Sequence, residues 1–298
     1  MGRLINAEFR KILTTKLWWA LLIPAVGLAL GWAWLSAIAF TDVASDITSA
    51  LDVNDVNDQE LSLSSLALTR AMNFATLFPL VFGALSLASE INRKTITTSF
   101  LTAPNRASVL GAKAVVYTIW GLIYGVIVAL AASLGVLIGT GDGALPGPGD
   151  WLLILLAGII ACVLWTLLGM GVGALLGSPV ATLVIVLLYA ALVGPTAEFI
   201  ITLSTEGSHI AGVMPNGSAN GLTGSTASEL LFNQIQDIFG SQIGTLSESQ
   251  IDDFDTVVRI AAGAPGAFSL WVSGLIFLGW TALFFGTGLM RNQRRDIT

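Results

Sequence analysis

The chain has 298 residues, of which 54% are hydrophobic and only 11% are charged. A soluble core of this size cannot bury so large an apolar fraction, and uncharged stretches long enough to cross a bilayer recur along the chain. The composition therefore excludes an ordinary soluble globular protein. The net charge of −6 comes mainly from segments between the apolar stretches, so it does not indicate a basic partner, and we expect no binding to nucleic acid.

The basic residues are grouped in a way that predicts a membrane topology. All but two of the 13 Lys and Arg residues, Arg70 and Arg259, lie in residues 1–16, 90–113 and 291–298. Short loops rich in Lys and Arg stay in the cytoplasm, so both termini are expected inside (N-in/C-in). We predict an all-α polytopic membrane protein with a single transmembrane domain. Its six transmembrane helices are expected at residues 17–40, 71–89, 114–139, 151–176, 180–201 and 267–290.

Residues 1–16 are predicted to form an amphipathic helix that lies in the inner membrane interface. Apolar and polar residues follow helical spacing on opposite faces, as Ile5, Phe9, Ile12 and Leu13 against Arg3, Asn6, Arg10 and Thr14. Such a helix can bury its apolar face in lipid, whereas the alternative is a solvated basic tail. A cleaved signal peptide ending near Ala37-Ile38-Ala39 is disfavoured, because the first apolar run is too long and more runs follow.

The segments predicted to lie outside differ in character. Residues 41–70 are acidic and polar, residues 140–150 form a short Gly/Pro turn, and residues 202–266 form a large extracytoplasmic helical region. Within that region, the Gly/Ser/Asn/Thr-rich residues 212–228 are interpreted as a loop. Two amphipathic helices follow, which either lie on the outer surface or dip back over the bundle. Their apolar faces carry Leu231, Ile235 and Ile238, and then Ile251, Phe254, Val258 and Ala261.

Glycines indicate a tight turn and close helix packing. Gly177-Ser178-Pro179 separates two apolar runs that would be too long for a bilayer as one helix, so it is predicted to be a turn at the inner surface. Gly169, Gly173 and Gly177 repeat the GxxxG spacing, which lets helix backbones approach closely. This spacing is compatible with packing inside one bundle or in a dimer.

Few ionisable or catalytic groups are available. Glu198 is the one charged residue inside the predicted spans, and its position near the outer interface predicts either a solvated boundary residue or an outer gate or substrate contact. The sequence has no HExxH, GxSxG or GxxxxGK[ST] motif, and its single cysteine, Cys162, cannot form an intrachain disulfide. We therefore expect no enzyme activity, metal or cofactor in this chain, and any energy must come from another polypeptide.

The middle basic segment, residues 90–113, carries a pattern that resembles the ABC-2 family of transporter permeases. In that family, an acidic residue ends the second span, a short helix led by Thr follows, and a Pro with a nearby Arg returns the chain to a Lys. The residues in those places are Glu90, Thr95, Pro104, Arg106 and Lys113. The family often has Gly-Thr where this chain has Lys94-Thr95.

The resemblance implies that residues 95–102 form a coupling helix that docks on a cytoplasmic ABC ATPase. That ATPase would bind ATP and Mg. Ile96, Phe100 and Leu101 would be the apolar anchor, flanked by Arg93, Lys94 and Arg106. The turn at residues 177–179 would be a second contact. The alternative is a loop that only fixes topology and lies on anionic membrane lipid.

By resemblance, the chain is the permease subunit of an ATP-driven exporter in the bacterial plasma or inner membrane. It would form half of a pathway with a second permease subunit, in a homodimer or heterodimer, for amphipathic or lipophilic cargo. A non-transport scaffold or sensor, which presents its acidic outer segments to a partner, is the rival class. A secondary carrier ranks third, because the spans lack the ionisable groups that ion coupling needs.

Overall fold

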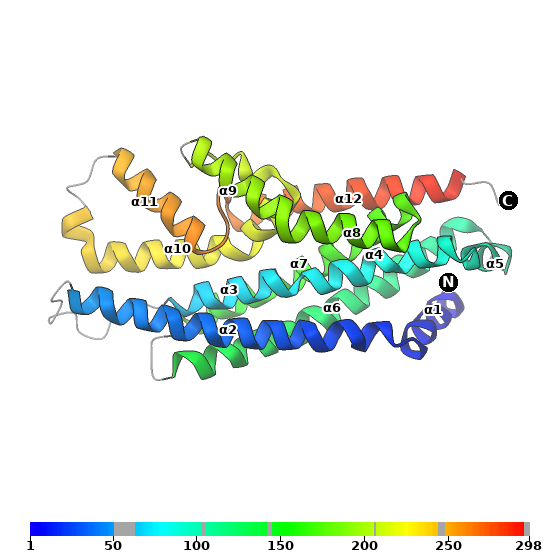
Figure 1. Cartoon of the computed structure of the whole chain (residues 1–298), viewed down its shortest axis with the longest axis horizontal. Coiled ribbons are helices and arrows are strands. Elements are labelled where there is room, and N and C mark those ends of the chain that lie inside the picture. The colour runs from blue at the N-terminus through cyan, green and yellow to red at the C-terminus, as the bar shows by residue number, and fades with distance from the viewer. Residues whose placement is uncertain (51–62, 103–104, 142–144, 206, 244–247, 295–298) are drawn as a thin grey trace.

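A computed structural model describes residues 1–50, 63–102, 105–141, 145–205, 207–243 and 248–294. These residues form an all-helical bundle without a strand (Figure 1). Six helical segments are long and apolar enough to cross a membrane, which confirms the predicted number of spans. The spans are α2 (Leu17–Ala50), α3 with α4 (Ser64–Ala75, Leu77–Asn92), α6 (Arg106–Thr140), α7 (Pro148–Leu176), α8 with α9 (Pro179–Leu188, Gly194–Ser204) and α12 (Leu270–Arg294).

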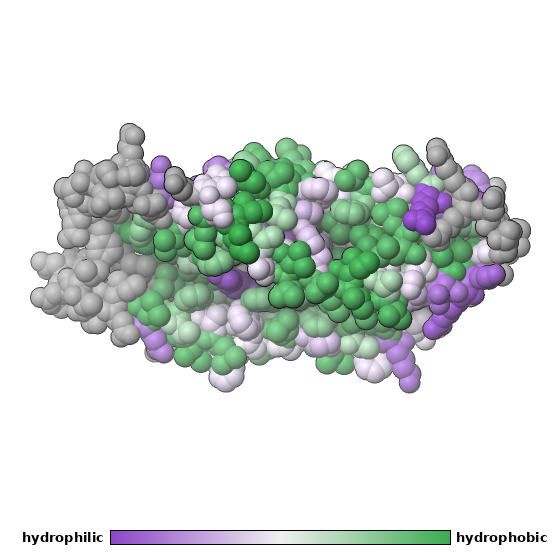
Figure 2. Space-filling model, turned by 45° about the horizontal axis from the view of Figure 1, so that its top comes forward, coloured by the Kyte–Doolittle hydropathy of each residue, from purple (hydrophilic) through white to green (hydrophobic). Residues whose placement is uncertain are grey.

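The remaining helices lie at the two ends of the bundle. Helices α1 (Gly2–Thr14) and α5 (Thr95–Thr102) lie at the end that also holds both chain termini (Figure 1). Helix α11 (Glu248–Ala261) and the later part of α10 (Pro215–Ile243) lie at the opposite end. We call the first the basic end, because the Lys and Arg residues of α1 and those next to α5 lie there. Figure 2 shows hydrophilic residues at this end, beside a broad apolar band. A common end for both termini is what an even number of spans requires.

Several helices extend beyond the expected spans. The second span begins at Ser64 instead of residue 71, and α6 begins at Arg106 instead of residue 114. Hydropathy marks only the apolar part of a helix, whereas capping decides where the helix begins. At α6, the side chain of Asn105 accepts a hydrogen bond from the backbone N–H of Ser108 at 2.7 Å, which satisfies a free donor of the first turn.

Small residues bring the central helices together. Ala25, Ala29 and Ala33 on α2 are fully buried, and α2 packs along α6. At Gly169 and Gly173, an added Cβ would collide with the backbone oxygens of the facing helix α4. These two glycines therefore pack inside the bundle, as small residues do in membrane helices.

Gly177 has a different role from the other two glycines of the triplet. It ends α7 in the left-handed conformation, with φ of 70°, and Ser178 then caps α8. Glycine adopts that conformation without a steric penalty, which explains why it stands at the turn. The expected tight turn is therefore present, and Gly177 belongs to it.

The prediction of a loop over residues 212–228 is wrong. Residues from Pro215 onward belong to α10, and most of residues 216–228 are buried against α12, α7 and α3. Glycine, serine and threonine are typical of loops in water, but in a bundle they allow close helix contact. Gly221 faces Ser273 of α12, and the Thr223 and Ser228 hydroxyls donate to carbonyls of their own helix. Helix α10 therefore returns into the bundle.

The two predicted amphipathic helices of the outer region are present as the second half of α10 and as α11. Leu231 and Val258 are buried between them and the bundle, and Ile235, Phe254 and Ala261 pack around that cluster. The side chain of Ile238 lies outside the described residues. These contacts favour the alternative in which the helices fold over the bundle.

Candidate functional site

The short helix α5 forms a corner between α4 and α6 at the basic end. Lys94 precedes it in the left-handed conformation, with φ of 57°, and the Thr95 hydroxyl donates to the carbonyl of Glu90 at 3.4 Å. A left-handed residue favours glycine, which gives a physical reason for the Gly-Thr pair of the resembling family. The departure at Lys94 therefore keeps the corner and adds strain to it.

The apolar residues of α5 divide between the protein interior and the surface. Ile96 is only 8% exposed and packs in a cluster with Ile12 of α1. Ile96 therefore packs inside the bundle, and its role as an anchor for a partner stays a prediction. Phe100 is half-buried, and the Arg106 guanidinium lies 5.5 Å from its ring centroid. Arg106 also donates to the carbonyl of Gln293 on α12 at 2.9 Å.

The other expected docking residues lie around this corner. Arg93, Lys94 and Thr95 are exposed. The side chain of Leu101 and the whole of Pro104 lie outside the described residues. The surface at this corner therefore carries the basic side chains of Arg93 and Lys94 before α5, and that of Arg106 beside the ring of Phe100.

A buried ion-pair cluster lies directly behind α5. Lys113 of α6 is fully buried and donates to Glu90 of α4 and Glu8 of α1, at 2.6 Å each. Lys11 of α1 also donates to Glu90. Sequence patterns placed Glu90 and Lys113 at the ends of two spans, but gave no sign that they meet. The cluster ties α1, α4 and α6 together, and removing one partner of such a buried pair leaves an uncompensated charge.

The turn at residues 177–179 also lies at the basic end of the bundle (Figure 1). Gly177, Ser178 and Pro179 are all half-buried. The side-chain oxygen of Ser178 accepts from the N–H of Ala181 at 3.5 Å, and Pro179 occupies the first turn of α8. A rigid turn of this kind offers a small, partly exposed surface next to the α5 corner.

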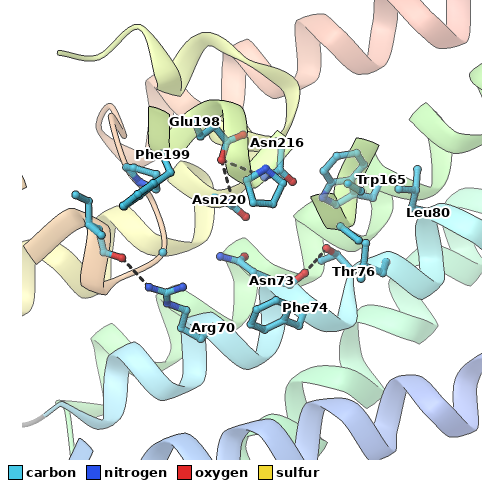
Figure 3. A pocket seen from close by; sticks show the side chains of 17 residues that line it. Arg70, Asn73, Phe74, Thr76, Leu80, Trp165, Glu198, Phe199, Asn216 and Asn220 are labelled. Atoms are coloured by element: carbon cyan, nitrogen blue, oxygen red, sulfur yellow. Dashed lines mark hydrogen bonds between the residues drawn. The ribbon is translucent and has the colours of Figure 1, made fainter. Parts of the chain in front are cut away.

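A cavity of about 370 Å³, lined by both apolar and polar side chains, lies in the other half of the bundle (Figure 3). We call it the polar cavity after the polar side chains in its wall. Two irregular points of the spans line it. One is the junction of α3 and α4 at Thr76. Pro79 follows this junction and has no backbone N–H, so the helical hydrogen bond to the preceding turn is missing. The other is a π-helical turn, Tyr189–Val193, before Pro195. Irregular backbone at membrane depth is tolerated where it lines a cavity, and π-turns are frequent at functional sites.

Glu198 lies in the wall of the polar cavity and is 1% exposed. Its Oε2 accepts hydrogen bonds from Asn216 at 3.1 Å and from Asn220 at 3.4 Å, both on α10. The interpretation of Glu198 as a solvated boundary residue is therefore wrong, because the returning helix α10 covers it. The place of Glu198 as an outer gate stays a prediction. Across the cavity lie Arg70 and Asn73 of α3 (Figure 3).

Arg70 is held in place by backbone carbonyls. Its Nε donates to Ala261 at 3.1 Å and its Nη2 to Ile260 at 2.7 Å. In the described part of the chain, no group of three or more His, Cys, Asp or Glu side chains could hold a metal ion.

The six apolar spans define a multi-pass membrane protein with a cavity inside its bundle. The chain belongs to the ABC-2 family transporter proteins, whose family model matches residues 3–297. No curated protein matches the chain.

Proposed function

We propose that this chain is the permease subunit of an ATP-driven ABC exporter. A separate cytoplasmic ATPase binds ATP and Mg, and a second permease subunit, identical or different, completes the pathway in the bacterial cell membrane. The observation that carries the proposal is the α5 corner backed by the buried ion-pair cluster of Glu8, Lys11, Glu90 and Lys113. Membership of the ABC-2 family supports it.

The exposed part of α5 is suited to contact with a protein groove. Phe100 provides a small apolar surface with Arg106 beside its ring, and the exposed Arg93 and Lys94 add positive charge at the start of the helix. Interfaces commonly combine an apolar centre with a polar rim, and arginine and aromatic residues are enriched in them. The turn at residues 177–179 is a second, smaller contact with the same ATPase.

The ion-pair cluster gives a physical route from α5 to the cavity. Glu90 lies on the last turns of α4, and Lys113 fixes it to α6 and to α1. A displacement of α5 therefore moves α4 with its neighbours. Helix α4 continues into α3 at Thr76, where the polar cavity begins. Packed helices move as rigid bodies, so such a shift opens or closes the cavity.

Helix α1 contributes to the same device at the membrane surface. Ile12 is buried and Ile5 and Phe9 pack against the bundle, whereas Leu13 is 50% exposed. The exposed basic residues of α1 are suited to contact with anionic lipid headgroups. The helix then anchors the basic end to the membrane interface while α4 and α6 move.

The rival function is a scaffold or sensor that transports nothing. Such a protein also lacks charges along most of its spans, but it has no need for a cavity at two interrupted helices. Transport driven by an ion gradient without ATP would instead favour a secondary carrier. A co-purifying ATPase with a phosphate-binding loop discriminates the permease from both.

The direct test is co-purification of the full-length chain with its ATPase, followed by ATP turnover of the complex in lipid nanodiscs. Phe100→Ala and Arg106→Ala should weaken complex formation and reduce stimulated ATP turnover by about tenfold or more, since both residues belong to the predicted interface. Arg3→Ala, which removes an exposed charge on α1, is the matched control. If the complex and its turnover ignore both α5 variants, the coupling assignment is wrong.

A further inference from the structure

The polar cavity contains a buried acceptor and a buried donor that the protein leaves unpaired. Oε1 of Glu198 and Nδ2 of Asn73 are inaccessible to solvent and have no hydrogen-bond partner among the described residues. Both side chains line the cavity, from α9 and α3 respectively (Figure 3). A buried polar atom without a partner is costly, so these two atoms point to a ligand that supplies a donor to Glu198 and an acceptor to Asn73.

One basic and one acidic side chain line the polar cavity. Arg70 and Glu198 are its two charged lining residues, and no ion pair between them is present in the described structure. A cationic ligand would be attracted by Glu198 but repelled by Arg70. An anionic ligand would be attracted by Arg70 but repelled by Glu198. A ligand with both charges satisfies the two residues at once.

An apolar groove of about 580 Å³ adjoins the polar cavity. The two share Leu80 and Trp165 as lining residues, so these side chains stand at the boundary between polar and apolar surroundings. No charged residue lines the groove. Three apolar residues that line the groove are about half exposed: Ile185 at 48%, Ile210 at 58% and Val213 at 47%.

The position of the groove indicates where its occupant comes from. Ile185 lies within the fifth span, and α8 and α12, which border the groove, belong to spans in which most residues of the apolar stretch are not buried in the bundle. Exposed apolar residues of a span face lipid, so the groove opens laterally to the hydrocarbon region. An acyl chain can enter it without crossing water.

We infer that the polar cavity and the apolar groove together bind one zwitterionic amphiphile from the bilayer. Its cationic group lies at Glu198, its anionic group lies towards Asn73 and Arg70, and its acyl chain lies in the groove past Trp165. This inference rests on the proposed function, because it assigns the cargo class of the permease. It also explains why the breaks in two spans meet at one place: they create room for a headgroup inside the bundle.

The test uses the purified full-length chain in maltoside detergent and native mass spectrometry to count bound molecules. Three probes carry the same 18-carbon monounsaturated chain and differ in the head: oleoyl-lysophosphatidylethanolamine (zwitterionic), oleoyl-lysophosphatidylglycerol (anionic) and oleylamine (cationic). The zwitterionic probe should bind one per chain, about tenfold more tightly than either other probe. Glycerophosphoethanolamine, which has the head without the chain, should bind far more weakly.

Two variants and a control localise the binding. Glu198→Gln removes the carboxylate and should reduce binding of the zwitterionic probe about tenfold, since it loses a charge-assisted hydrogen bond. Ile185→Trp narrows the groove and should weaken binding of the chain-bearing probes. Asp150→Asn, a carboxyl-to-amide change outside both sites, should leave binding unchanged.

Equal binding of the three probes, or binding that ignores both Glu198→Gln and Ile185→Trp, would overturn the inference. Binding of glycerophosphoethanolamine as tight as that of the lipid would also overturn it, because the ligand would then be a soluble head. The ATPase and nucleotide are absent from this measurement. A failure here therefore leaves the coupling through α5 intact, and a chain without an ATPase partner can still pass it.

Discussion

Replacing Lys113 with methionine removes the central cation of the buried cluster while keeping a side chain of similar length. Lys113 makes two ion pairs of 2.6 Å, and its side chain is 1% exposed. Each charge-assisted hydrogen bond contributes about 1.5–3 kcal/mol. The change also leaves Glu90 and Glu8 facing each other without that cation. Together these effects predict a loss of about 3–5 kcal/mol in the free energy of unfolding.

The assay is reversible unfolding of the full-length chain in mixed micelles, followed by tryptophan fluorescence. Lys16→Met, which removes an exposed lysine near the same end, is the control and should change stability by less than about 0.5 kcal/mol. Replacing Glu90 with methionine in the Lys113→Met background should recover about 1 kcal/mol or more, because one buried charge is removed. If Lys113→Met is as stable as the control, the cluster does not hold these helices together.

Further predictions use the same unfolding assay. Lys94→Gly should be about 1 kcal/mol more stable than Lys94→Ala, because both remove the side chain but only glycine relieves the left-handed strain; equal stabilities would contradict the strained corner. Gly173→Leu should destabilise by about 3 kcal/mol or more through overlap with α4, whereas Gly27→Leu, in open space, should be neutral. Asn216→Ala should lower the free energy of unfolding by about 1–3 kcal/mol, since Glu198 loses one of its two side-chain donors. An unchanged stability would mean that this hydrogen bond is not formed in micelles.

The sequence was sufficient for the parts of the fold that depend on local composition. Apolar length predicted the six spans, and the Gly177-Ser178-Pro179 turn followed from the need to divide one long run. Helical spacing predicted the amphipathic helices at residues 2–14 and 248–261. Each of these signals is contained within about one helix, so no knowledge of packing partners is needed.

The errors came where long-range packing decides the outcome. The Gly- and Ser-rich start of α10 reads as a loop because those residues favour loops in water, and only the facing helices show that it is buried. Glu198 then changes from a boundary residue into a buried one, since α10 covers it. Likewise, Glu8 and Lys113 lie 105 residues apart, and no local pattern indicates their contact. The position of Lys113 in an apolar helix indicates only that this lysine needs an anionic partner, and not which residue that partner is.

A cross-link between α5 and the ATPase tests the coupling most directly. In a Cys162→Ser background, which removes the only native cysteine, Thr95→Cys places a thiol at an exposed position of α5 and leaves Phe100 and Arg106 in place. Leu145→Cys places a thiol at the opposite end, where Leu145 is 44% exposed. A thiol-to-amine cross-linker applied to the complex in nanodiscs should join the ATPase to position 95 and not to position 145. Joining from position 145, or none from position 95 in an intact complex, would contradict the claim that α5 receives the energy for transport.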